Sequence, residues 1–162
     1  MTDAVMLRDA TADDADALTD ALVEAMNWHG RDRLSKAAVM SQPHLAHYVA
    51  GWPRPGDFGT IAVAGATAVG AAWCRTFTAE DPGYGYVADD VPELSIGVSP
   101  TWRTQGIGTA LLARVISQAQ HRGMRGVSLS VQDGNRAGVL YERAGFTPVS
   151  REGNSDVTLR TL

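Results

Sequence analysis

Apolar residues recur every three or four positions in two stretches of the chain, which is the spacing of one face of a helix. The pattern predicts helices over residues 12–27 and 109–120. Thr11 and Asp14 have the spacing of a capping box, so they are expected to mark the start of the first helix. The apolar positions that define this first helix are Ala15, Leu18, Leu22 and Met26.

Shorter helical segments are expected elsewhere. Residues 35–49 are interpreted as further helix, in which Pro43 begins a new turn because proline lacks the amide hydrogen that a helix interior requires. Asn135 is placed to cap a short helix that runs through Arg143 and ends at Gly145.

Strands are predicted where β-branched residues gather or where apolar and polar residues alternate, as they do around Leu129. The predicted strands cover residues 5–8, 60–63, 68–77, 93–98, 127–131, 146–149 and 157–162. In chain order the elements are a strand, two helices, three strands, a helix, a strand, a helix and two strands. This order predicts a mixed α/β domain built around one central sheet.

Length and charge narrow the function classes. The 162 residues suit a single core, so residues 1–162 are expected to form one domain. The formal charge is −4 and Lys and Arg form no block, which argues against a nucleic-acid partner and against an anionic membrane surface.

The sequence also indicates a compartment. Cys74 is the only cysteine, which excludes an internal disulfide framework and favours a reducing environment; the residue itself is expected to pack in the core. Residues 1–4 lack the basic start and apolar stretch of a signal peptide. The uncharged run over residues 61–74 is too short for a membrane-spanning helix. We therefore expect a cytoplasmic protein without a membrane segment.

The most informative segment lies just before the helix at 109–120 and reads Arg103-Thr104-Gln105-Gly106-Ile107-Gly108-Thr109. The first turn of a helix has unpaired N–H groups and a partial positive charge, both of which attract phosphate. Gly106 and Gly108 leave room for a pyrophosphate, and Arg103 can add charge. Alternatively, the two glycines only let the helix begin close to the sheet. The segment is neither a Walker A loop, since no Gly-Lys-Ser/Thr follows, nor the dinucleotide fingerprint, whose third glycine is replaced by Leu111.

Two further motifs accompany this glycine-rich turn. Leu94-Ser95-Ile96-Gly97-Val98-Ser99-Pro100 precedes it, and Asn135 followed by Leu140-Tyr141-Glu142-Arg143-Ala144-Gly145-Phe146 comes after it. Together and in this order, over residues 93–146, the three motifs resemble those of the GNAT superfamily of acetyl-CoA-dependent N-acetyltransferases. The resemblance implies a GNAT fold. This is a mostly antiparallel mixed sheet of about seven strands, splayed at the fourth and fifth and flanked by about four helices.

The resemblance also implies ligands and the residues that hold them. The acyl donor would be acetyl-CoA, the acceptor a small-molecule or peptide amine, and no metal would be needed; a homodimer is expected. Backbone groups of residues 96–98 would pair with the pantetheine arm, and N–H groups of residues 104–109 would hold the pyrophosphate. Asn135 would lie beside the arm and Tyr141 near the thioester sulfur. The implied cofactor-binding residues are Ile96, Gly97, Val98, Arg103, Thr104, Gln105, Gly106, Ile107, Gly108, Thr109, Asn135 and Tyr141.

Acetyl transfer to an amine needs a base for the amine proton and an acid for the leaving thiolate. Tyr141 is the candidate acid, with simple core packing as its alternative. Glu93 is the candidate base because it begins the strand that meets the cofactor, where some family members use a glutamate. Others carry a glutamate on the next strand, where this chain has Ser130. A water chain is the alternative base, since a shift of one residue would turn Glu93 to the other face of the sheet.

Weaker signals leave further alternatives open. The acidic loop before Glu93 either attracts a cationic amine or is simply solvated. Tryptophans near element ends line a cleft, anchor a dimer or fill gaps in the packing. His44 and His47 have no third ligand, so they are expected on a helix surface. The members of the acidic loop are Glu80, Asp81, Tyr84, Tyr86, Asp89 and Asp90, and the tryptophans are Trp28, Trp52 and Trp102.

Three functions therefore compete. The leading hypothesis is N-acetyltransfer from acetyl-CoA to an amine. A non-catalytic acyl-CoA-binding regulatory module and an acyltransferase that uses a longer acyl-CoA are the alternatives. Residues 12–52, which would shape the acceptor pocket, carry no motif that names the amine.

Overall fold

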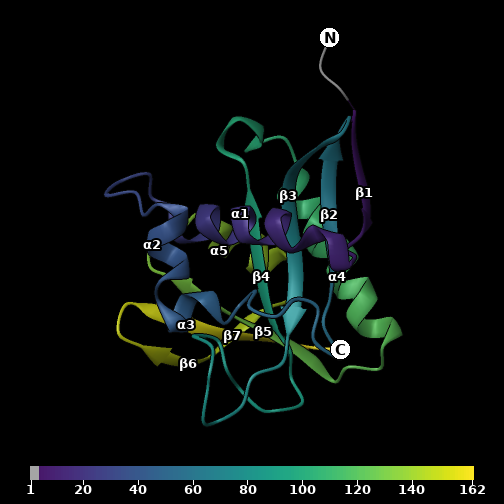
Figure 1. Ribbon diagram of the computed structural model, residues 1–162. Helices are drawn as coiled ribbons and strands as arrows, with labels where there is room; N and C mark the ends of the chain where they lie inside the picture. Colours follow the sequence, from purple (N-terminus) through teal and green to yellow (C-terminus); the bar gives the residue numbers. More distant parts are fainter. Residues whose placement is uncertain (1–3) are drawn as a thin grey trace.

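One seven-stranded sheet forms the centre of the computed structural model, which describes residues 4–162 (Figure 1). The strands are β1 (Val5–Asp9), β2 (Phe58–Ala64), β3 (Thr67–Arg75), β4 (Glu93–Val98), β5 (Gly126–Gln132), β6 (Thr147–Glu152) and β7 (Ser155–Thr161). Their order across the sheet is β1-β2-β3-β4-β5-β7-β6, and every neighbouring pair is antiparallel except β4 and β5. The predicted mixed sheet is confirmed. Residues 1–3 lie outside the described residues. They belong to the segment that is expected to lack a signal peptide.

The parallel pair β4 and β5 separates almost as soon as it forms. The two strands are paired only at Glu93 and Ser128. By contrast, β4 is paired with β3 along its whole length, and β5 is paired with β7 along its own. The splay expected at the fourth and fifth strands is therefore present, and it leaves one edge of β4 without a strand partner.

Within residues 4–162, five α-helices flank the sheet, where about four were expected. They are α1 (Ala15–Met26), α2 (Lys36–Met40), α3 (Pro43–Ala46), α4 (Ile107–His121) and α5 (Ala137–Arg143). Two short 3-10 turns, at Ala12–Asp14 and Pro100–Trp102, precede α1 and α4. The extra helix arises because residues 35–49 divide at Pro43, which starts α3 instead of continuing α2. Ser35 caps α2 by accepting a hydrogen bond from the Ala38 N–H.

The helices cover the two faces of the sheet separately. Helices α1 to α3 pack on one face around Leu18, Leu22 and Trp73. Helices α4 and α5 pack on the other around Leu112 and Leu129. In Figure 1, α1 crosses in front of β3 and β4, while α4 and α5 lie behind the sheet.

Gly97 lets α1 lie directly on β4. A side chain at this position would collide with the backbone of Ala21, whose carbonyl carbon would be only 2.7 Å from an added Cβ. Helix α1 therefore covers Gly97 from one face of the sheet. The backbone of Gly97 on the side toward β5 has no strand partner.

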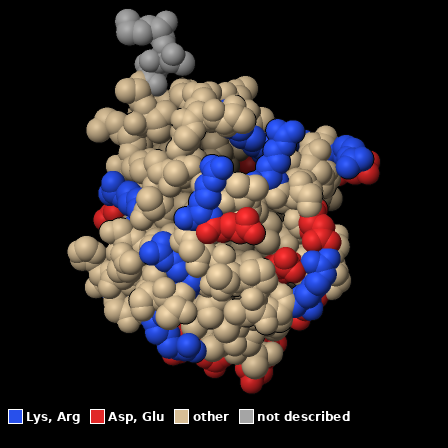
Figure 2. Space-filling view, turned by 180° about the vertical axis from the view of Figure 1, so that it is seen from behind, with Lys and Arg blue, Asp and Glu red and all other residues tan. Residues whose placement is uncertain are grey.

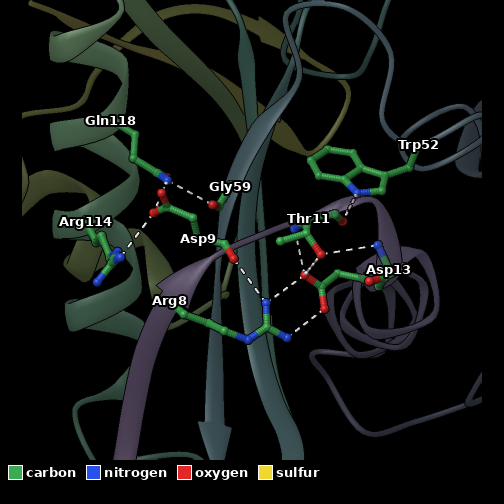
Figure 3. Close-up of polar contacts among 9 residues, drawn as sticks. Arg8, Asp9, Thr11, Asp13, Trp52, Gly59, Arg114 and Gln118 are labelled. Carbon is green, nitrogen blue, oxygen red and sulfur yellow. Dashed lines mark hydrogen bonds and ion pairs between the residues drawn. The ribbon is translucent and has the colours of Figure 1, made fainter.

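Polar contacts tie the edge strand β1 to both helical layers (Figure 3). The Arg8 guanidinium donates to both oxygens of Asp14 at 2.7 and 2.8 Å, and Asp14 accepts from the Thr11 N–H at 2.7 Å, so the predicted capping box is present. On the other side, Arg114 and Gln118 of α4 both donate to Asp9. These contacts fix β1 between α1 and α4.

A buried ion pair ties the end of β3 to the segment after α3. Arg75 and Asp57 are both 1% exposed at the side chain and lie 2.7 Å apart. Arg75 also donates to the backbone carbonyls of His47 and Ala50 at 2.9 and 2.7 Å. The segment between those two carbonyls, which contains Tyr48, is thereby held against the sheet.

Other features of the fold bear on the remaining expectations. Cys74 is fully buried, in agreement with its expected place in the core. Within residues 4–162, no helix combines the length and the apolar character needed to cross a membrane. On the face turned away from the viewer in Figure 1, basic and acidic side chains are mixed and do not form one patch of a single sign (Figure 2).

Candidate active site

A cleft of about 1260 Å3 opens where β4 and β5 separate. Its walls are the free edge of β4, the first turn of α4, the end of β5 and helix α5, with the end of α1 and the β6–β7 turn at its rim. The predicted site residues that line it are Glu93, Ile96, Gly97, Val98, Arg103, Thr104, Gly106, Ile107, Gly108, Thr109, Asn135 and Tyr141. Gln105 is not among the lining residues; its side-chain amide donates to the Thr101 carbonyl at 3.2 Å.

The glycine-rich turn presents unpaired N–H groups to this cleft. Gly106 caps α4 in the left-handed region with φ of 82°, and the first helical hydrogen bond runs from the Ala110 N–H to the Gly106 carbonyl at 3.1 Å. The N–H groups of the preceding residues 107–109 therefore have no acceptor within the helix. A side chain at Gly108 would meet only Leu140, at 3.6 Å, so packing against the sheet does not explain this glycine.

Arg103 is anchored beside the turn, and its charge is shared. Its Nε donates to the Val98 carbonyl at 3.1 Å, and its Nη2 lies 3.1 Å from Oε2 of Glu24 in α1. Glu24 also pairs with Arg33. The sequence carried no signal for Glu24, because its place beside Arg103 follows from the packing of α1 on β4.

The free edge of β4 can accept an extended ligand. Residues 94–98 are paired with β3 on one side and have no β5 partner on the other. An extended arm can add to such an edge as a further strand does, by backbone hydrogen bonds. Ile96, Gly97 and Val98 lie on this free edge and line the cleft next to the α4 turn.

Tyr141 and Asn135 come from the α5 region on the opposite wall of the cleft. Tyr141 is 8% exposed and packs edge-on against Phe146, yet it also lines the cleft, so core packing and a site role coexist. Burial raises the pKa of its phenol well above the ordinary value, which keeps the proton on at neutral pH. The Asn135 side chain accepts from the Ala137 N–H at 3.0 Å, but α5 begins at Ala137 with Arg136, not the expected Asn135, at its N-cap position.

Glu93 points to the face of the sheet opposite the α4 layer. Leu94 and Ile96 pack with the α4 cluster, so Glu93 and Ser130 share the other face by strand alternation. The Glu93 residue is 4% exposed and accepts from the Gly85 N–H at 2.7 Å. Burial raises its carboxyl pKa to about 7, against the opposing effect of hydrogen bonds from Tyr48 and Gly85. The group is therefore poised to gain or lose a proton near neutrality.

Tyr48 and Tyr84 also line the cleft; Tyr84 belongs to the acidic loop noted in the sequence, whereas Tyr48 was not among the sequence-based candidates. The Tyr84 N–H donates to the Tyr48 hydroxyl oxygen at 2.8 Å, and the two rings stack with centroids 6.5 Å apart. Tyr48 carries no such signal in the sequence, because its place in the cleft follows from the packing of the segment after α3.

The acidic loop lies mostly away from the cleft. Asp81 pairs with His47, Asp89 accepts from Tyr86, and Asp90 pairs with Arg125, and none of the three carboxylates lines the cleft. This favours the interpretation of a solvated loop whose charges have local partners.

Of the three tryptophans, Trp28 and Trp102 line the cleft, whereas Trp52 donates to the Thr11 carbonyl elsewhere. Trp28 donates to the Gln132 side chain at 2.7 Å and so joins the end of α1 to the end of β5. His47, expected on a helix surface, is largely covered instead, since it packs against Tyr48 and Phe77. Among residues 4–162, no three His, Cys, Asp or Glu side chains gather as metal ligands would.

A splayed mixed sheet, with a helix that begins at the open edge of its fourth strand, defines the acetyltransferase fold expected from the motifs. Comparison with protein families finds the acetyltransferase (GNAT) family over residues 22–146, so the chain belongs to that family. The identification made from the sequence is confirmed.

The curated relatives match only part of the chain. The [ribosomal protein bS18]-alanine N-acetyltransferase of Haemophilus influenzae is 31% identical over 86 residues, which are 53% of this chain and 52% of that protein. Its Escherichia coli K12 counterpart is 35% identical over 69 residues, 42% of this chain and 47% of that protein. The match thus spans about half the length of these relatives.

Solved structures match over nearly the whole chain and at low identity, so they bear on the fold alone. The PaiA N-acetyltransferase of Thermoplasma acidophilum in complex with coenzyme A has a TM-score of 0.66 at 17% identity, covering 98% of this chain and 99% of that one. The ribosomal-protein-alanine N-acetyltransferase of Brucella melitensis has a TM-score of 0.68 at 22% identity, covering 97% and 99%.

Proposed function

We propose that this protein transfers an acetyl group from acetyl-CoA to an amine by direct attack of the amine on the thioester. One observation carries the proposal. The unpaired N–H groups at the start of α4 and the unpaired edge of β4 border a single cleft that also contains Glu93 and Tyr141. Family membership supports the same donor and reaction class.

The donor is held mainly by backbone groups in this proposal. The N–H groups of residues 104–109 bind the pyrophosphate, and the first turn of α4 adds its partial positive charge. The edge of residues 96–98 pairs with the pantetheine arm. Arg103 contributes less charge than a free guanidinium would, because Glu24 shares it. Asn135 lies beside the arm, and this arrangement directs the thioester toward Tyr141.

Glu93 is proposed as the base. A primary amine is mostly protonated at pH 7, so its proton must leave before the nitrogen lone pair can attack the carbonyl carbon. The Glu93 carboxylate accepts that proton, directly or through one water. Its raised pKa of about 7 makes it a stronger base than an exposed carboxylate and leaves it ionised in a useful fraction of molecules.

Tyr141 is proposed as the acid that completes the reaction. When the C–S bond breaks, the electron pair stays on the sulfur of coenzyme A and the phenol donates a proton to it. Burial weakens Tyr141 as an acid, but desolvation in the same cleft also disfavours the thiolate and strengthens it as a proton acceptor. Burial thus raises the pKa of the Tyr141 phenol and that of the coenzyme A thiol together. The phenol can therefore still donate its proton to the thiolate.

The acceptor is proposed as a primary amine, and the names of the curated relatives put the α-amine of an N-terminal alanine first among the candidates. The test measures coenzyme A release from acetyl-CoA by the purified protein with an amine panel: an alanine-initiated peptide, a lysine peptide with a blocked N-terminus, a polyamine and small primary amines. Release with at least one amine supports the proposal. Tight binding of acetyl-CoA without release on any amine would instead identify a binding module.

Two further arms sharpen the assay. Propionyl-CoA and longer acyl donors, compared with acetyl-CoA by kcat/KM, test the acyl-chain preference. Gel filtration of the same purified protein tests the homodimer expected from the resemblance. The homodimer and the cytoplasmic location both stay predictions.

A further inference from the structure

The segment Gly83-Tyr84-Gly85 covers the Glu93 carboxyl group. Gly83 lies so close that an added Cβ would be 2.8 Å from the carboxyl carbon of Glu93. At Gly85 an added Cβ would be 2.6 Å from the backbone carbon of Leu129 in β5. The segment therefore fills the space between the carboxyl group and β5, and neither position has room for a side chain.

Hydrogen bonds join this segment to the carboxylate. The Gly85 N–H donates to Oε1 of Glu93 at 2.7 Å, and the Tyr84 N–H donates to the Tyr48 hydroxyl oxygen at 2.8 Å. Consecutive N–H groups of the segment thus bond to Tyr48 and to Glu93, and the Tyr48 hydroxyl acts to lower the pKa of the Glu93 carboxyl. A phenol has one proton, and because the hydroxyl oxygen already accepts from the Tyr84 N–H, that proton is available to the nearby carboxylate.

Tyr48 is itself held rigidly from several sides. It is 4% exposed, its ring packs against Phe77, and its carbonyl accepts from the Trp73 indole at 2.9 Å. Arg75 bonds to the carbonyls of His47 and Ala50, on either side of it. Packing and hydrogen bonds from several sides therefore hold the Tyr48 ring, and with it the hydroxyl, in place.

We propose that Tyr48 is a positioning residue, which together with Gly83-Tyr84-Gly85 holds the Glu93 carboxylate in one orientation and leaves its remaining acceptor capacity for the acceptor amine. The inference rests on the proposed function, in which Glu93 takes the amine proton. Sequence patterns could not have assigned it, because Tyr48 lies 45 residues from Glu93 (93 − 48) and meets it only through the packing of the segment after α3.

The groups that face Glu93 from the surrounding elements define what the test must exclude. They are Tyr48 after α3, Tyr84 of the covering loop, Arg75 of β3 and Ser128 of β5, whereas Cys74 and Tyr141 belong to the α4 side of the sheet. Arg75 is committed to Asp57, and the pKa of the buried Cys74 thiol is raised. Tyr48 and the Gly85 N–H are the hydrogen-bond donors that lower the Glu93 carboxyl pKa, so loss of either should raise it.

The experiment follows the Glu93 carboxyl directly and needs no acceptor. Protein labelled with 13C at the glutamate side-chain carboxyl is titrated by NMR, and Glu93→Gln assigns the resonance. We expect the wild-type signal to titrate near 7. Tyr48→Phe keeps the ring and removes the hydroxyl, and should raise that midpoint by roughly one unit, as expected for one hydrogen bond to a charged group.

Controls separate positioning from damage to the fold. Tyr86→Phe is the matched variant, since it removes a hydroxyl that bonds to Asp89 on the same loop, and it should leave the midpoint unchanged. Gly85→Ala should displace the N–H donor and raise the midpoint as well, provided that circular dichroism shows a folded protein. Equal midpoints in wild type and in folded Tyr48→Phe would overturn the inference.

Turnover adds an independent measurement once an acceptor is known. In Tyr48→Phe the acidic limb of kcat/KM should move to higher pH by the same amount, with the Kd for acetyl-CoA unchanged. Absence of any acetyl transfer would count against the proposed function, while the NMR midpoints would still decide whether the contact with Tyr48 exists. An unmoved pH profile in an active Tyr48→Phe enzyme would contradict the positioning role alone.

Discussion

The two sides of the cleft are built on different principles. On the cofactor side, which comprises residues 96–109, Asn135 and Tyr141, the proposed binding relies on backbone groups at a strand edge and a helix start. On the base side, the Tyr48 hydroxyl and the Glu93 carboxylate accept from consecutive N–H groups of the 83–85 loop, so segments distant in sequence must meet. Backbone recognition depends on local motifs, whereas the base side exists only once the chain has packed. Donor binding and proton transfer should therefore respond separately to mutation.

The largest effect should come from removing the base. Glu93→Gln keeps the size of the side chain but cannot accept the amine proton, so kcat should fall by about 100- to 1000-fold, within the range of general base catalysis. The Kd for acetyl-CoA should not change. Steady-state kinetics would measure kcat, and isothermal titration calorimetry would measure the Kd. Wild-type activity in the variant would contradict Glu93 as the base and favour a water chain.

The pH profile of the same enzyme sharpens this prediction. Because the carboxyl must be ionised to accept a proton and its pKa is about 7, kcat/KM should rise as pH increases through that value. The rise should be absent in the residual activity of Glu93→Gln. If kcat/KM of the wild-type enzyme did not change between pH 6 and 8, Glu93 would not be the group that accepts the amine proton.

Tyr141→Phe should have the next largest effect, lowering kcat by about 100-fold as loss of a general acid does. Phenylalanine keeps the packing against Phe146, so the melting temperature and the acetyl-CoA Kd should stay close to wild type. Acceptors compared by kcat will show whether the loss is common to all amines, as the departure of a shared thiolate requires. Unchanged turnover would leave Tyr141 as a packing residue only.

Gly108→Val should affect the cofactor side alone. The added side chain meets only Leu140 within the protein, but it would occupy the space where the pyrophosphate approaches. We expect the Kd for acetyl-CoA to rise about 30- to 100-fold, equivalent to losing about one or two charge-assisted hydrogen bonds. The Glu93 midpoint should not move in this variant, and a Kd equal to that of wild type would contradict the phosphate cradle.

The smallest effect concerns the edge strand and should spare both sides of the cleft. Arg8 lowers the pKa of the Asp14 carboxyl below its usual range, so the stabilisation is present above the unfolded pKa and is lost as pH falls through the folded one. Asp14→Asn should cost about 1 kcal/mol at pH 7, typical of a lost helix cap. Denaturant unfolding at falling pH should show the difference in free energy of unfolding between wild type and variant disappearing below about pH 4. A difference that persisted there would rule out this ion pair as its cause.

The sequence predicted the features that depend on neighbours in the chain. The capping box at Thr11 and Asp14, the break at Pro43 and the turn before α4 all have local causes, so their positions could be predicted. Which face Glu93 points to could not, because it depends on strand register. The contact of Glu24 with Arg103 spans 79 residues, and it follows from the seating of α1 on Gly97.

The most direct test of the account is a crystal structure of the protein with coenzyme A. The diphosphate should accept hydrogen bonds from the N–H groups at the start of α4, the pantetheine arm should run along the free edge of β4, and the sulfur should end beside Tyr141. A diphosphate bound elsewhere, or an arm that leaves the β4 edge empty, would contradict the assignment of this cleft.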